Sequence, residues 1–106
     1  MGREIKLGRL AGLDIENVLV YLAVELGMPG TARNFRDKLS KSLIRLTELP
    51  ELGRLISDDD LTQPYRRILV ERHWVYYSYN ENTLIVWRVF HESQSKDIGG
   101  YGFWER

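Results

Sequence analysis

The sequence predicts an α+β domain in which two helices cover one face of a small antiparallel sheet. Apolar residues recur at helical spacing in the first half of the chain, and runs of Val, Ile, Tyr and Trp that suit strands fill the second half. A sheet with its helices segregated onto one face belongs to the α+β class. The 106 residues correspond to a single domain, residues 1–106.

The helical half begins after a short predicted strand at residues 3–7. Residues 10–26 predict a first helix with Asp14 as its N-cap, and the Gly-Met-Pro-Gly stretch at 27–30 ends that helix. Thr31 then predicts the N-cap of a second helix, in which apolar residues recur at steps of three and four: Ala32, Phe35, Leu39, Leu43 and Leu46. Two helices joined by a tight turn form an αα-hairpin.

The strand half follows an acidic loop. Three strands are predicted, at residues 65–71, 73–79 and 83–90. Asn80–Asn82 reads as a three-residue hairpin turn, because asparagine tolerates positive φ. Glu71-Arg72 joins the first two strands with residues that suit a tight turn less well. The three strands therefore predict an antiparallel meander.

Composition excludes several classes of site. The chain has no cysteine, which removes disulfides and thiolate metal sites, and its two histidines do not predict a metal centre. The start of the sequence lacks the apolar core of a signal peptide, and its longest apolar stretch, residues 18–24, is far below the roughly 20 residues that span a bilayer. We therefore expect a cytoplasmic protein without membrane contact.

The charges balance overall but are segregated along the chain. Fifteen basic and fifteen acidic residues give a net charge of zero, which argues against binding to nucleic acid through bulk charge. Residues 31–47 are nevertheless mainly basic, and residues 48–60 are mainly acidic. Two interpretations stay open here: a solvated helix face followed by an acidic loop, or a functional basic patch.

Four segments together resemble the RelE/ParE superfamily, the small toxins of type II toxin–antitoxin systems, over about residues 10–97. They are Leu49-Pro50-x-x-Gly53, Tyr65-Arg66-Arg67-Ile68-Leu69, Trp74-Val75-Tyr76-Tyr77 and Ile85-Val86-Trp87-Arg88-Val89-Phe90-His91. The resemblance implies a twisted antiparallel sheet with the αα-hairpin on one face and a cognate antitoxin that wraps the toxin. It also implies growth inhibition, a role in plasmid stabilisation and no cofactor.

Two branches of this superfamily imply different activities. The RelE-like branch cleaves mRNA on the ribosome, and by resemblance its catalytic residues here would be Arg66, Arg67, Arg88, His91 and Tyr101. Two basic positions that this branch expects are filled instead by Trp74 and by the stretch 92–95. Whether the protein is an enzyme therefore stays open.

The ParE-like branch poisons DNA gyrase by binding it. Its strand patterns are matched better, by the stretch 73–77 and by a last strand that ends Arg88-x-x-His91. The resemblance therefore favours a toxin that acts on gyrase. A third alternative is a degenerate protein that keeps the fold and serves only as a binding module.

Two site residues also have structural interpretations. Arg88 alternates with Val86 and Phe90, so its stem can pack on apolar neighbours while its guanidinium pairs with Asp97 or Glu92, or it contacts a target. His91 either closes the strand by hydrogen bonding or acts as an acid or base near neutral pH.

Arg66 and Arg67 are adjacent on a predicted strand. Their side chains are therefore expected on opposite faces of the sheet.

Overall fold

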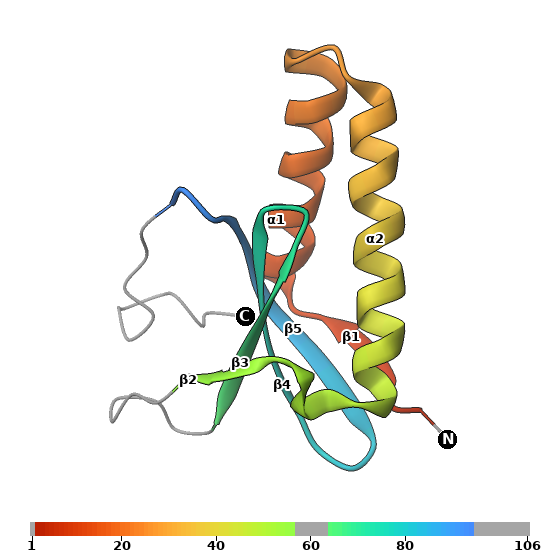
Figure 1. The fold of residues 1–106 in the computed structure, drawn as a ribbon, viewed down its shortest axis with the longest axis vertical. Helices are drawn as coiled ribbons and strands as arrows, with labels where there is room; N and C mark the ends of the chain where they lie inside the picture. Colours follow the sequence, from red (N-terminus) through yellow and green to blue (C-terminus); the bar gives the residue numbers. More distant parts are fainter. Residues whose placement is uncertain (1, 57–63, 95–106) are drawn as a thin grey trace.

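The computed structural model describes residues 2–56 and 64–94, and it confirms the α+β class (Figure 1). One five-stranded sheet has the order β1-β5-β4-β3-β2, and two long helices lie on one of its faces. The elements, in chain order, are β1 (Glu4–Leu7), α1 (Arg9–Val20), the π-helix η1 (Tyr21–Glu25), α2 (Pro29–Glu48), the 3-10 helix η2 (Pro50–Leu52), β2 (Arg54–Ile56), β3 (Tyr65–Val70), β4 (His73–Tyr79) and β5 (Thr83–His91).

The sheet is mixed rather than wholly antiparallel. Strands β2 to β5 form an antiparallel series that includes the predicted meander, whereas β1 pairs with β5 in parallel, and the helical hairpin leads from β1 to β2 at the opposite edge of the sheet. Strand β2 was not predicted from the sequence, which placed an acidic loop there. It is a three-residue edge strand, which is too short for an alternation of apolar and polar residues to identify it as a strand.

Both predicted helix starts are wrong. Helix α1 begins at Arg9 with Gly8 as its N-cap, so Asp14 lies inside the helix. The Gly8 N–H bonds to the carbonyl of Val86, so the chain passes from β1 directly into the helix. Helix α2 begins at Pro29 rather than after Thr31, because proline is well suited to the first helical turn.

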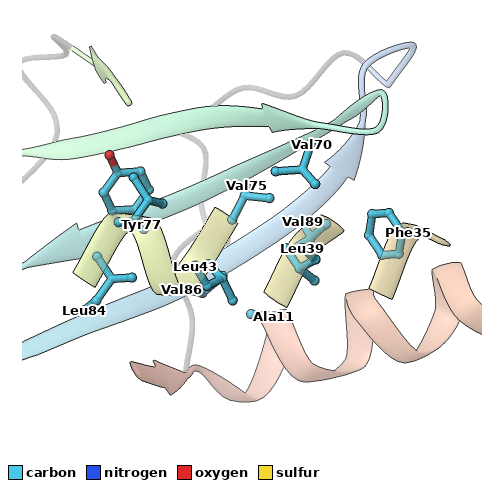
Figure 2. Close-up of a cluster of buried hydrophobic side chains, with 11 residues drawn as sticks. Ala11, Phe35, Leu39, Leu43, Val70, Val75, Tyr77, Leu84, Val86 and Val89 are labelled. Atoms are coloured by element: carbon cyan, nitrogen blue, oxygen red, sulfur yellow. The ribbon is translucent and has the colours of Figure 1, made fainter. Parts of the chain in front are cut away.

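The core lies between the αα-hairpin and the sheet. All five predicted apolar residues of α2 are buried. Four of them, Phe35, Leu39, Leu43 and Leu46, belong with Ala11 to a core cluster that includes the inner face of the sheet (Figure 2). The sheet contributes Val70, Val75, Tyr77, Leu84, Val86 and Val89. This packing fixes the hairpin over β4 and β5, the strands that carry the candidate site.

A buried phenol fixes the loop after α2. The hydroxyl of Tyr77 donates to the carbonyl of Pro50 at 2.6 Å and accepts the N–H of Gly53 at 2.9 Å. A Cβ at Gly53 would lie 2.3 Å from that hydroxyl oxygen, so only glycine fits there without a shift. The Leu49-Pro50-x-x-Gly53 motif therefore serves as the docking site of a core tyrosine.

A β-bulge changes which side chains of β5 face the core. The register of β5 against β4 shifts between Tyr76 and Tyr77, and Arg88 comes to lie opposite Tyr76. Val89 consequently joins the core with Val86, while Phe90 packs with Tyr76 in a separate cluster. The predicted alternation of Val86, Arg88 and Phe90 on one face is therefore wrong.

The helical hairpin extends beyond the sheet. In Figure 1 its upper part, around α1, η1 and the start of α2, stands past the β3–β4 turn. That turn consists of Glu71 and Arg72, both at positive φ (45° and 68°). The sequence disfavoured this pair as a turn, yet it makes a two-residue hairpin that faces the overhanging helices.

Candidate functional site

An ion pair joins Asp14 of α1 to Arg88 of β5. Arg88 Nε lies 2.9 Å from Asp14 Oδ2 and Nη2 lies 3.1 Å from Oδ1, and the backbone N–H of Val89 also donates to Oδ2 at 2.9 Å. Only 17 % and 14 % of the two side chains' surfaces are exposed. Because a bidentate, partly buried pair is strong, it holds α1 against β5 beyond the end of β1.

Glu92, one of the two predicted partners of Arg88, pairs with Arg72 instead, at 2.7 Å between Arg72 Nε and Glu92 Oε2. Asp97 lies outside the described residues. The guanidinium of Arg88, besides bonding to Asp14, lies over the ring of Phe90 at 4.4 Å. Arg88 therefore has a structural role at the junction of helix and sheet.

Two histidines pair across the ends of β4 and β5. His73 lies opposite His91, and their ring centroids are 5.1 Å apart in an edge-to-face arrangement. His73 Nδ1 donates to the carbonyl of Glu71 at 2.8 Å, whereas His91 Nδ1 accepts the backbone N–H of Ser93 at 3.0 Å. Neutral His73 thus carries its proton on Nδ1 and neutral His91 on Nε2.

Burial and its neighbour affect the charge of His73. Its imidazole packs on the ring of Phe35, at 4.7 Å between centroids, and is 8 % exposed. Desolvation is the main cause that lowers the pKa of His73 below 6.5, and His91 lowers it further, against an opposing hydrogen bond to Glu71 and the charge of Glu92. His73 is therefore neutral at pH 7.

These groups line a cleft of about 840 Å³ under the overhanging hairpin. One wall is apolar and comes from α1, η1 and the C-cap of η1, with Val18, Tyr21, Leu22 and Leu26. The opposite wall comes from the ends of β4 and β5, with His73, Val89 and His91, and Asp14 and Arg88 lie at its polar end. The cleft therefore combines an apolar wall with many polar side chains, of which Asp14, Arg88 and the two histidines form hydrogen bonds within the protein.

The apolar wall continues onto the surface as a patch at the tip of the hairpin. This hairpin-tip patch consists of Val20, Tyr21, Val24, Leu26 and Met28, which are between 47 % and 73 % exposed. The π-helix η1 lies within it, and Gly27 at φ 62° turns the chain there. A contiguous exposed apolar surface of this kind is typical of a protein-binding site.

Arg66 and Arg67 lie on opposite faces, as predicted, and neither lines the cleft. Arg66 lies in register with the core residue Tyr77, and its Nη1 donates to the carbonyl of Gly53 at 2.8 Å. Arg67 is on the outer face, where its guanidinium lies 4.0 Å from the centroid of a Trp74 ring.

The structure brings only part of the predicted catalytic set together. Arg88 and His91 share the cleft, Arg66 and Arg67 lie elsewhere, and Tyr101 lies outside the described residues. Within residues 2–56 and 64–94, no three potential metal-ligating side chains lie together. The same residues contain no helix long and apolar enough to cross a membrane.

Sequence reasoning missed two residues of the site. Asp14 is 74 positions from Arg88 and was assigned to a helix cap, so no local spacing indicated the pair. The sequence places His73 in a strand motif of the resemblance and offers it as a second histidine, but it predicts no contact between His73 and His91. The pairing of His73 with His91 depends on the β-bulge. Without the bulge, the register that pairs Tyr79 with Leu84 would place Phe90 opposite His73.

A family model described as "ParE toxin of type II toxin-antitoxin system, parDE" matches residues 5–96. A solved structure titled "Chromosomal ParDE TA system from P. aeruginosa" superposes with a TM-score of 0.65 at 14 % identity, and the match covers 84 % of this chain and 95 % of that one. No curated protein shows significant sequence similarity.

Proposed function

Because the chain belongs to the ParE toxin family of type II toxin–antitoxin systems, we propose that it is a growth-inhibiting toxin that binds DNA gyrase. In the same proposal a cognate antitoxin neutralises it, and both partners meet it in the cytoplasm. A contribution to plasmid stabilisation is an expectation of the superfamily rather than of any feature of the site.

One observation carries the proposal: exposed apolar residues of the hairpin-tip patch also line the cleft. Tyr21 and Leu26 belong to both, so a single partner segment is able to bury exposed patch residues and fill the cleft at once. Exposed apolar surface is costly in water and gains free energy when a partner covers it, at roughly 25 cal/mol per Å². The feature suits a protein that works by association.

We assign this surface to the antitoxin. An amphipathic segment laid into an apolar groove is a common mode of recognition, in which a few apolar anchors enter the groove. Val18 and Leu22, one turn apart on the cleft wall, offer contacts for such anchors. Gyrase would then contact the toxin through surfaces that the antitoxin covers or distorts.

Metal-free mRNA cleavage receives less support from the described residues. That chemistry needs basic groups and an acid or base gathered around one phosphate. Arg88 is paired with Asp14, Arg66 bonds to a loop carbonyl and Arg67 stacks on Trp74 on the other face. These contacts favour binding over catalysis for the chain.

Expression without antitoxin tests the proposal. Bacterial growth, chromosomal breaks and the 5′ ends of a translated mRNA would be followed after induction. Growth arrest with DNA breaks and intact messages is the expected result. Cuts at codons within the reading frame would support the ribosome-dependent nuclease, and unhindered growth would support the degenerate binding module.

A further inference from the structure

Part of the basic segment of the chain lies along one flank of α2. Three side chains of this flank, Lys38, Lys41 and Arg45, follow one another at steps of three and four, so they form a row about 10 Å long. All three are exposed. We call this row the α2 basic row.

The acidic residues of α2 form no ion pair with the row. Asp37 and Glu48 lie one helical turn from Lys41 and Arg45, but Asp37 instead approaches Arg36, at 3.9 Å. No residue of the described part of the chain forms an ion pair with the α2 basic row. Its positive charge is therefore directed to solvent or to a partner.

The α2 basic row begins one helical turn after the residues of α2 that line the cleft. Asn34 lines the cleft and lies one helical turn before Lys38, on the same flank of α2. Thr31, one turn earlier, lines the cleft as well. A segment that leaves the cleft past Asn34 would therefore follow Lys38, Lys41 and Arg45 along the helix.

From this continuity we propose that the α2 basic row binds an acidic stretch of the antitoxin, adjoining the apolar stretch that fills the cleft. The inference rests on the proposed function, since it takes the occupant of the cleft to be the antitoxin. Charge complementarity steers association and fixes the register of a partner. The row would thus make antitoxin capture faster and dependent on salt.

An acidic protein segment fits this surface better than a nucleic acid does. The chain has no net charge, so it lacks the basic field that binding to a phosphate backbone requires. Ile44, which is 61 % exposed on α2, also offers an apolar contact that phosphates would not use.

Binding of a defined probe tests the inference. Fluorescence anisotropy would measure the affinity of the purified full chain for a labelled oligoglutamate peptide and, separately, for a labelled duplex DNA. The variant K38E/K41E/R45E reverses the row, and R33E/R36E/R54E is the matched control with the same change in net charge. A neutral variant, K38Q/K41Q/R45Q, repeats the test without added acidic groups, and circular dichroism checks that each variant folds.

We expect both row variants to weaken oligoglutamate binding about tenfold or more, and the control to weaken it far less. Amide resonances of residues 34–45 should shift with the peptide, and added salt should reduce the affinity. Equal loss in row and control variants, no binding by the natural chain, or row-dependent binding that prefers DNA would each overturn the inference. Since none of these readouts requires toxicity, failure of the toxin assay would remain a separate result.

Discussion

Asp14 and Arg88 connect the first helix to the last strand through two contacts of 2.9 and 3.1 Å, and the same carboxylate accepts the backbone N–H of Val89. Strand β1 ends at Leu7, opposite Val86, so the next stretch of β5 has no neighbouring strand on that side. The carboxylate of Asp14 occupies this position and serves as the hydrogen-bond acceptor there. The polar end of the cleft is thus held by the fold itself.

Replacing Asp14 by Ala should destabilise the protein by about 2–4 kcal/mol, because it leaves the mostly buried Arg88 charge and the Val89 N–H without their acceptor. Urea denaturation followed by circular dichroism measures the change. Asp37→Ala is the control, since its pair with Arg36 spans 3.9 Å between side chains that are 66 % and 60 % exposed. Similar losses for both variants would contradict a structural role for the Asp14–Arg88 pair.

Removing the hydroxyl of Tyr77 should also lower stability. Tyr77→Phe leaves the Gly53 N–H and the Pro50 carbonyl unpaired in a buried position, at a cost of about 1–3 kcal/mol. Gly53→Ala should cost at least as much, because its Cβ would meet the hydroxyl. Thermal unfolding is the measurement, and Tyr21→Phe, at a half-exposed position, is the control that should change little.

The stability of the protein should fall on acidification because of His73. Its pKa is lowered in the folded state, so the unfolded chain binds a proton more readily. The contribution is fully present above about pH 6.5, decreases as the pH falls below that value, and levels off once the pH is below the folded pKa. The free energy of unfolding should therefore change less steeply with pH between pH 5 and 7 for His73→Gln than for the natural chain. An NMR titration of the His73 ring checks its pKa directly. An unchanged slope would contradict this account.

Charge placed in the hairpin-tip patch should prevent neutralisation by the antitoxin without harming the fold. Val24 is 73 % exposed, so Val24→Glu should change the free energy of unfolding by no more than about 0.5 kcal/mol. Growth of cells that express toxin and antitoxin together is the readout, and the variant should escape neutralisation. Leu69→Glu, at a half-exposed apolar residue on β3 outside the patch, the cleft and the α2 basic row, should still be neutralised. If the antitoxin neutralised both variants alike, the patch would be excluded as the antitoxin site.

Periodic patterns made much of this fold predictable. Phe35 and Leu39 lie on a regular helical stripe, and the aromatic and β-branched runs from Tyr65 onward are long enough to identify three strands. The polar site was harder to predict from the sequence, because Asp14 contacts Arg88 only through tertiary packing. The β5 bulge, which places His91 opposite His73, has no signature in the residues around it.

The most direct test of the central claim is the action of the purified chain on purified DNA gyrase. A supercoiling assay, run with a parallel assay of mRNA cleavage on translating ribosomes, compares the two targets under the same conditions. We predict that the chain stops gyrase supercoiling and leaves cleaved DNA bound to the enzyme, while the mRNA stays intact. Unaffected gyrase together with mRNA cut within its codons would contradict the account.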